Sequence, residues 1–232
     1  MWQKNLQGNF WVNLKYCTFQ ELCVDTHEEI SNSLIYLKNL TTITCLISIL
    51  TDGIVKTLAQ CYNLKKINFS IDFMSLTKKG VIWFAGFDNL ESLTFTCRIK
   101  SDTKINISSV LNAITLSNKN IKELNVIDCD IGSSGLNYIS MQENLTVLKL
   151  SITYKFIKLL MNAINKNLPN LQEIEIDSET MLNYPFLKKI NDKKVKRDDQ
   201  NILKIYVDEW IWNDTQRYHR EFSMLSILKR QN

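Results

Sequence analysis

Proline and glycine are scarce in this sequence, with two prolines and six glycines among 232 residues. That scarcity excludes a long proline-rich or glycine-rich linker, so we expect a single domain spanning residues 1–232. No apolar run approaches the roughly 20 residues that a membrane helix requires. The first ten residues, MWQKNLQGNF, also lack the apolar core of a secretory signal. We therefore expect an intracellular protein, cytoplasmic or nuclear, without a membrane partner.

Histidines and closely spaced cysteines are also lacking, which limits the chemistry available to the chain. The two histidines, His27 and His219, stand far apart, so a nucleophile–base–acid arrangement has little to draw on. None of the six cysteines forms a Cys-x-x-Cys pair, so a zinc cage is not expected. Without a secretion signal we interpret them as reduced thiols. The segment GSSG, residues 132–135, lacks the ending of a phosphate loop and is interpreted as a turn before a helix. We expect no enzyme activity, no metal site and no cofactor.

What the sequence does contain is a short pattern that recurs along its length. In NLKKINFS, residues 63–70, apolar and polar residues alternate after an asparagine. This predicts a half-buried strand with Leu64, Ile67 and Phe69 inward and Lys66 and Asn68 outward. Six further copies begin at Asn39, Asn89, Asn120, Asn144, Asn170 and Asn201. Successive first apolar residues lie 24, 26, 31, 24, 26 and 31 positions apart, and a weaker eighth copy is placed at Trp11, Leu14 and Tyr16.

Segments with helical spacing lie between these strands. In residues 51–64, TDGIVKTLAQCYNL, the apolar Ile54, Leu58 and Cys61 share one helical face. Residues 153–168, TYKFIKLLMNAINKNL, have the same kind of apolar face. Strand and helix alternating at this period predict parallel strands lying side by side with the helices outside. Stability then comes from contacts between neighbouring units.

Residues 124–140, LNVIDCDIGSSGLNYIS, resemble the cysteine-containing leucine-rich repeat. In that repeat a cysteine and an isoleucine follow the strand, and a glycine–apolar pair opens the helix. The matching residues are Cys129, Ile131, Gly135 and Leu136, and residues 51–67 resemble the other half of the repeat. The resemblance covers residues 11 to about 208. It implies an α/β leucine-rich-repeat solenoid, a horseshoe arc with parallel strands on its concave face and helices on its convex face.

The same resemblance implies a non-catalytic protein-interaction module. Repeats of this kind form the substrate-recognition arc of F-box-type ubiquitin ligases, and ribonuclease-inhibitor-like arcs bind other proteins. An F-box is a helical module ahead of the repeats, and none is visible before residue 11. The resemblance therefore implies either the recognition part of a ligase whose F-box lies outside this chain, or a repeat-only binder or inhibitor of another protein.

The C-terminal part of the chain predicts a closing element. We place about eight repeats in residues 11–212 and a capping helix in residues 213–230. Asn213 and Gln216 have the spacing of a helix capping box. Apolar side chains then follow at helical spacing, namely Tyr218, Phe222, Leu225 and Leu228. A helix here would cover the apolar edge of the last repeat.

The outward strand residues line the predicted concave face, which is polar in the early repeats and acidic and aromatic near its end. The predicted partner-binding residues are Glu173, Glu175, Asp177, Tyr206, Asp208 and Trp210. Acidic groups flanked by aromatic rings fit a protein partner with a basic or mixed surface. The alternative is a solvated face, with Trp210 packed under the cap.

A second candidate surface is the segment 188–197, in which five lysines and one arginine are crowded together. Such a segment is typical of a nuclear import signal or a nucleic-acid patch, and the alternative is a charged surface loop. The formal net charge of +4 is too small to argue for nucleic acid by itself. A nuclear or nucleic-acid-associated factor that acts through this segment is therefore an alternative function for the protein. The expected partner is a protein rather than a nucleic acid.

Overall fold

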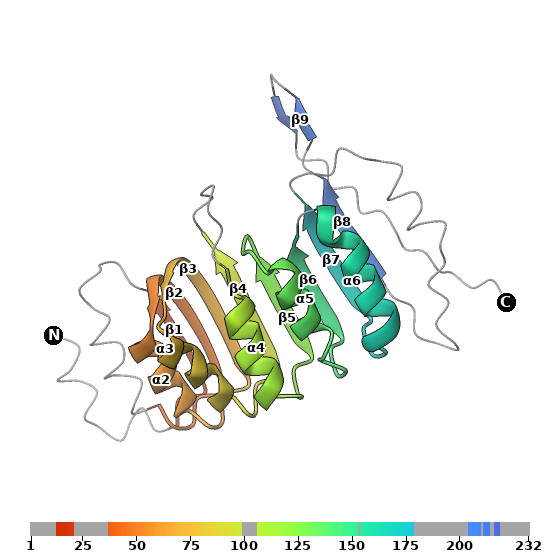
Figure 1. Ribbon diagram of the computed structural model, residues 1–232. Helices are drawn as coiled ribbons and strands as arrows, with labels where there is room; N and C mark the ends of the chain where they lie inside the picture. The colour runs from red at the N-terminus through yellow and green to blue at the C-terminus, as the bar shows by residue number, and fades with distance from the viewer. Residues whose placement is uncertain are drawn as a thin grey trace.

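The computed structural model describes residues 13–20, 37–98, 106–152, 154–178, 204–209, 211–213 and 216–218. Eight strands form one parallel sheet, and their order across the sheet is their order along the chain (Figure 1). The strands are β1 (Tyr16–Gln20), β2 (Thr42–Thr51), β3 (Lys66–Ser75), β4 (Ser92–Cys97), β5 (Glu123–Ile127), β6 (Val147–Ser151), β7 (Glu173–Ser178) and β8 (Lys204–Glu209). The predicted α/β class and the parallel strands are confirmed.

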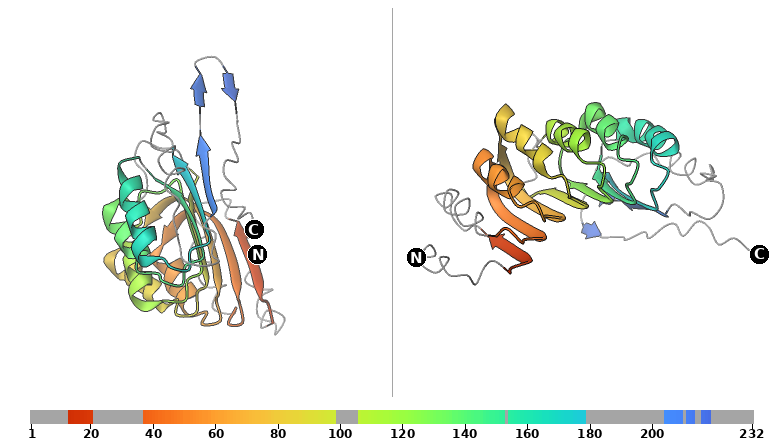
Figure 2. Two further views of the ribbon diagram at one scale, coloured as in Figure 1. Left: turned by 90° about the vertical axis from the view of Figure 1, so that its right-hand side faces the viewer. Right: turned by 90° about the horizontal axis from the view of Figure 1, so that it is seen from below.

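Helices connect the strands and lie on one face of the sheet, as both views in Figure 2 show. They are α2 (Asp52–Ala59), α3 (Lys78–Ile82), the 3₁₀ helix η4 (Trp83–Gly86), α4 (Ser108–Ser117), α5 (Gly132–Ile139) and α6 (Tyr154–Asn167). The two segments with helical spacing, residues 51–64 and 153–168, contain α2 and α6. The segment GSSG is not a turn before a helix, because it forms the first turn of α5. Gly132 opens that turn at φ +51°, where glycine has no steric cost.

Strand alternation divides the side chains as the sequence predicts. Two inward columns cross the sheet in register, and every member is at most 2% exposed. The first contains Ile43, Ile67, Leu93, Leu124, Leu148 and Ile174, and the second contains Cys45, Phe69, Phe95, Val126, Leu150 and Ile176. The Phe69 ring contacts the Phe84 ring of η4 at a centroid distance of 6.3 Å, which joins the sheet to the helical layer.

The eighth copy of the pattern exists and its Leu14 packs against the core, but Tyr16 does not point inward, and Trp11 lies outside the described residues. Cys17 pairs with the inward Ile43, and Phe19 with the inward Cys45, whereas Tyr16 is 69% exposed. The copy is therefore NLKYCTF, starting at Asn13, with the same Asn-apolar-x-x-apolar-x-apolar spacing as the others. The prediction took Trp11 as the first apolar residue, three positions before Leu14, and a shift by an odd number of residues reverses the face of every side chain in a strand.

In five of the copies the opening asparagine has a structural role. Its side-chain amide donates a hydrogen bond to a backbone carbonyl in the turn of the preceding unit. The bonds are Asn63 Nδ2 to Lys38 O (3.3 Å), Asn89 to Tyr62 O (2.8 Å), Asn120 to Asp88 O (3.4 Å), Asn144 to Lys119 O (2.8 Å) and Asn170 to Glu143 O (2.9 Å). This asparagine ladder satisfies turn carbonyls that the strands leave without a partner, and so it links each unit to the next.

The predicted capping helix 213–230 is wrong at the positions that the structure describes. Residues Ile211–Asn213 form β9 and residues Gln216–Tyr218 form β10, and the two strands pair antiparallel. Isoleucine, tryptophan and tyrosine favour strands, and this preference outweighs the capping-box spacing. The other residues of the predicted helix, Trp210 and the basic segment 188–197 lie outside the described residues. Among the helices that the structure describes, none is long and apolar enough to cross a membrane.

Candidate functional site: the open face of the sheet

The face of the sheet opposite the helices is the candidate functional surface, and we call it the open face (Figure 2). Within the described part of the chain, no helix covers it. One row of side chains crosses its middle in register, and we call this the central row: Thr44, Asn68, Thr94, Asn125, Lys149 and Glu175. Most of these side chains are half-buried between neighbouring strands rather than fully solvated. They therefore present a surface whose side chains are already held in place.

The half of the open face on β2–β4 carries mainly hydroxyl and amide groups. Its main ion pair joins Arg98 to Asp72 through two bonds, Nε to Oδ1 and Nη2 to Oδ2, each of 2.9 Å. A two-bond guanidinium–carboxylate pair fixes both side chains in one plane. Because the two charges cancel, this half of the face has little net charge beyond that of the exposed Lys66.

The half of the open face on β5–β7 carries interlinked carboxylates. Glu123 accepts hydrogen bonds from Ser92 Oγ and Asn125 Nδ2, both at 3.0 Å. On the next strands, Lys149 Nζ lies 2.6 Å from Glu175 Oε2. The Glu175 hydrogen bond raises the pKa of Lys149, with further contributions from the charges of Glu173 and Glu123. One ammonium group is therefore bonded to one carboxylate and attracted by the charges of two more.

Two amide oxygens of the central row lack hydrogen-bond partners. Asn68 Oδ1 and Asn125 Oδ1 are both buried and accept no bond within the described structure. Asn125 is only 8% exposed. Its Nδ2 donates hydrogen bonds to Thr94 Oγ1 at 3.1 Å and to Glu123, whereas its Oδ1 accepts none. A buried acceptor without a donor carries a free-energy penalty that strands and turns normally avoid. Asn125 Oδ1 is therefore an acceptor on the open face for which the described structure supplies no hydrogen-bond donor.

The structure brings several of the predicted partner-binding residues together. Glu173 and Glu175 lie on the open face of β7, as expected, and β8 places Tyr206 beside Glu175 and Asp208 beside Asp177 in the register. Glu175 also forms an ion pair with Lys149, a contact that was not predicted from the sequence. Three further residues of this site, Lys149, Asn125 and Glu123, were not among the predicted partner-binding residues. The repeat alignment contained the missing signal, since Lys149 and Glu175 both follow their opening asparagine by five residues.

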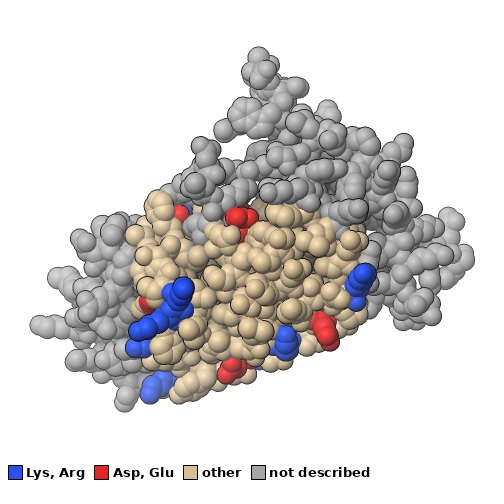
Figure 3. Space-filling model, viewed as in Figure 1, with Lys and Arg blue, Asp and Glu red and all other residues tan. Residues whose placement is uncertain are grey.

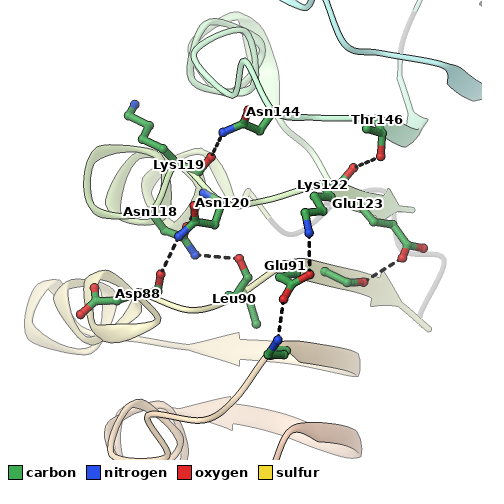
Figure 4. A network of polar contacts seen from close by, with 12 residues as sticks. Asp88, Leu90, Glu91, Asn118, Lys119, Asn120, Lys122, Glu123, Asn144 and Thr146 are labelled. Carbon is green, nitrogen blue, oxygen red and sulfur yellow. Dashed lines mark hydrogen bonds and ion pairs between the residues drawn. The ribbon is translucent and has the colours of Figure 1, made fainter.

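A second polar surface lies at the edge of the sheet where the strands begin, and we call it the strand-start edge. A shallow groove of about 750 Å³ runs along the asparagine ladder. Glu91 stands there between two lysines, with Lys65 Nζ and Lys122 Nζ each 2.9 Å from its carboxylate (Figure 4). Hydrogen bonds from Lys122 and Lys65 lower the pKa of Glu91 to about 2. The amide groups that line this groove are already used to link neighbouring units, which is a structural role.

The face formed by the helices differs from both surfaces because it has few charges at its centre. Neither α4 nor α5 contains a charged residue, and Figure 3 shows the charged side chains toward the margins of this face. Single large apolar side chains are exposed on it, among them Leu116 at 69% and Met141 at 47%. Isolated exposed apolar side chains are ordinary on protein surfaces, so this face is the natural comparison surface for experiments.

Three of the described cysteines, Cys17, Cys45 and Cys61, are suited to packing rather than to nucleophilic chemistry. Burial raises the pKa of the Cys17 thiol to about 11, and burial also raises the pKa values of Cys45 and Cys61. A thiol must ionise to act as a nucleophile, and these thiols stay protonated near neutral pH. Within the described ranges, no group of three or more histidine, cysteine or acidic side chains is arranged to hold a metal ion.

Comparison with known proteins adds no identity to this picture. No protein-family model matches the chain, and no curated protein matches its sequence.

Proposed function

We propose that this protein is a non-catalytic protein-interaction module of the leucine-rich-repeat type, and that its open face is the surface that binds a protein partner. The observation that carries the proposal is a parallel sheet on which every described helix lies on the same face. Parallel sheets in proteins almost always have both faces covered. Repeat proteins are the main exception, and they use the uncovered strand face as an extended binding surface.

The repeat organisation supports the leucine-rich-repeat part of the proposal. Each unit contributes one strand that starts at the same position after its asparagine, and the helices pack in the same order as the strands. The resemblance of residues 51–67 and 124–140 to the cysteine-containing repeat points in the same direction. In this proposal the open face is the concave face of an arc.

The charge of the open face favours a partner with a basic or mixed surface. Across β5–β8, sequence and register assign to this face five acidic residues, Glu123, Glu173, Glu175, Asp177 and Asp208, and two lysines, Lys149 and Lys204. The formal charge of this half is therefore 2 − 5 = −3. Complementary charge steers encounter and selects against acidic partners.

The biological role that we propose for this binding surface follows from the resemblance to leucine-rich-repeat proteins. Recognition of substrates for an F-box-type ubiquitin ligase requires an F-box outside this chain, whereas a repeat-only binder or inhibitor requires none. Ligase adaptor subunits captured by the full-length gene product would support the first role. A partner captured without such subunits would support the second.

The experiment is quantitative affinity capture with one blocking variant and one matched control. Thr96→Arg places a long cation on the open face of β4 at a half-buried position, and Asn137→Arg makes the same addition at an exposed position of α5. We expect Thr96→Arg to lose a specific partner that the wild type and Asn137→Arg both retain. Thermal melting checks that both variants are folded. Equal capture by all three proteins would contradict the proposal.

A further inference from the structure

The strongest unassigned feature of the open face is an excess of acceptors around Lys149. Glu175 forms an ion pair with the Lys149 ammonium, and Glu123 accepts hydrogen bonds from Ser92 Oγ and Asn125 Nδ2. No donor to the Glu173 carboxylate is found among the side chains that the structure describes, and the register neighbour of Glu173 on β8 is Lys204. On the other side of Lys149, its register partner on β5 is Asn125, whose Oδ1 is the orphan acceptor.

We propose that Glu173 and Glu175 form the anchoring site for a cationic side chain, arginine or lysine, of the protein partner, and that Lys149 is the internal counter-ion that this side chain displaces. The inference rests on the proposed function, because it names the chemistry of one contact within the open face. Carboxylates two residues apart on one strand point to the same side. An arginine guanidinium has five donors in a planar fork and can bond both carboxylates at once.

The orphan amide oxygen explains how Lys149 can leave Glu175 without losing all of its hydrogen bonds. Lys149 and Asn125 are register partners on adjacent strands, so the lysine side chain has only to turn from one neighbouring strand to the other. Lysine carries its charge on a flexible four-carbon stem, which makes this turn inexpensive. The ammonium then donates to Asn125 Oδ1, close to the Glu123 carboxylate that Asn125 already binds at 3.0 Å. The acceptor without a donor in the free protein gains its donor in the complex.

The same observations argue against a metal ion as the ligand. Within the described residues no three acidic side chains converge closely enough to hold one. Lys149 also occupies the space between the carboxylates of β7 and the strand β5. A guanidinium suits this site better because it bridges separated carboxylates and is weakly hydrated.

The test uses a fluorescein-labelled hexa-arginine peptide, with hexa-glutamate as the negative probe, and fluorescence anisotropy at about 0.1 M salt, where charges are screened beyond roughly 10 Å. Glu175→Gln and Glu173→Gln should each weaken hexa-arginine binding about fivefold. Lys149→Met, which keeps the stem and removes the charge, should tighten binding about threefold because the internal competitor is gone. The matched controls Glu91→Gln and Lys122→Met remove the same charges from the ion pair at the strand-start edge. They should change the peptide affinity less than twofold, because salt screens these charges from a peptide bound at β7.

Nuclear magnetic resonance supplies a readout that bulk electrostatics does not move. The Asn125 side-chain amide signal should shift on peptide addition in the wild type and should not shift in Lys149→Met. The inference is overturned if Lys149→Met weakens binding or leaves it unchanged, if the controls equal the β7 variants, or if the Asn125 signal does not shift. If this assay fails while Thr96→Arg still abolishes partner capture, the proposed function stands and only this inference falls. If Thr96→Arg leaves capture intact, the proposed function itself fails.

Discussion

Replacing Asn118 by alanine tests whether buried amides connect the repeat units. Asn118 is 1% exposed, and its Nδ2 donates to Phe87 O at 2.7 Å and to Leu90 O at 2.9 Å in the preceding unit. Its Oδ1 accepts from the backbone N–H of Asn120 at 2.7 Å. Two buried hydrogen bonds and one partly buried bond, at about 1 kcal/mol each, give an expected loss of about 3 kcal/mol in the free energy of unfolding. For a chain of this length, that loss lowers the melting temperature by roughly 6–12 °C.

The control is Asn144→Ala, which removes one exposed bond of 2.8 Å to Lys119 O from the asparagine ladder. That variant should lose only about 0.5 kcal/mol, since water can replace an exposed donor. Urea denaturation followed by circular dichroism measures both losses under the same conditions, and a constant slope confirms that the same surface unfolds. If Asn118→Ala is destabilised no more than Asn144→Ala, the buried amide does not link the two units and the reasoning is refuted.

Two further variants test the strand-start edge and a close contact between units. Because Lys65 and Lys122 hold the folded pKa of Glu91 near 2, below its ordinary 4.5, their stabilisation is present above about pH 4.5 and is lost as the pH falls toward 2. Wild type should therefore lose about 1 kcal/mol more than Glu91→Gln between pH 5 and pH 2.5 in urea titrations, and parallel pH curves would contradict this account. In Gly80→Ala the new Cβ would lie 1.8 Å from Asp52 Oδ1, so calorimetry should show a loss of roughly 1–3 kcal/mol; an unchanged melting temperature would show that Asp52 moves aside freely.

The repeat pattern predicted the sheet because each unit carries the same spacing from its asparagine to its inward residues. Side chains at equal distance from that asparagine become neighbours across strands, and this rule gives the Lys65–Glu91–Lys122 contact directly from the sequence. The same rule would have corrected the first unit, where Asn13 rather than Trp11 sets the register. Apolar periodicity alone allowed both choices.

Other features lay beyond pattern reasoning. In the column two residues before each opening asparagine, Leu37, Cys61, Phe87 and Leu168 are apolar, whereas Asn118 and Gln142 are polar and equally buried. Burial of an amide depends on three-dimensional hydrogen-bond partners, here the carbonyls that Asn118 reaches, which the periodicity does not encode. The orphan acceptor at Asn125 has the same origin, because it depends on which donors the neighbouring strands bring near Oδ1.

Lysine labelling of the complex tests the central claim, that the open face is the partner-binding surface, most directly. Lys66 and Lys149 lie on the open face, whereas Lys65 and Lys122 lie at the strand-start edge beside Glu91. After capture of the partner, reductive methylation of the free and bound protein gives a labelling rate for each lysine by mass spectrometry. We predict that binding slows the labelling of Lys66 and Lys149 severalfold and leaves Lys65 and Lys122 at their free rates. Slowed labelling of Lys65 and Lys122, with Lys66 and Lys149 unchanged, would place the partner on the strand-start groove and contradict the account.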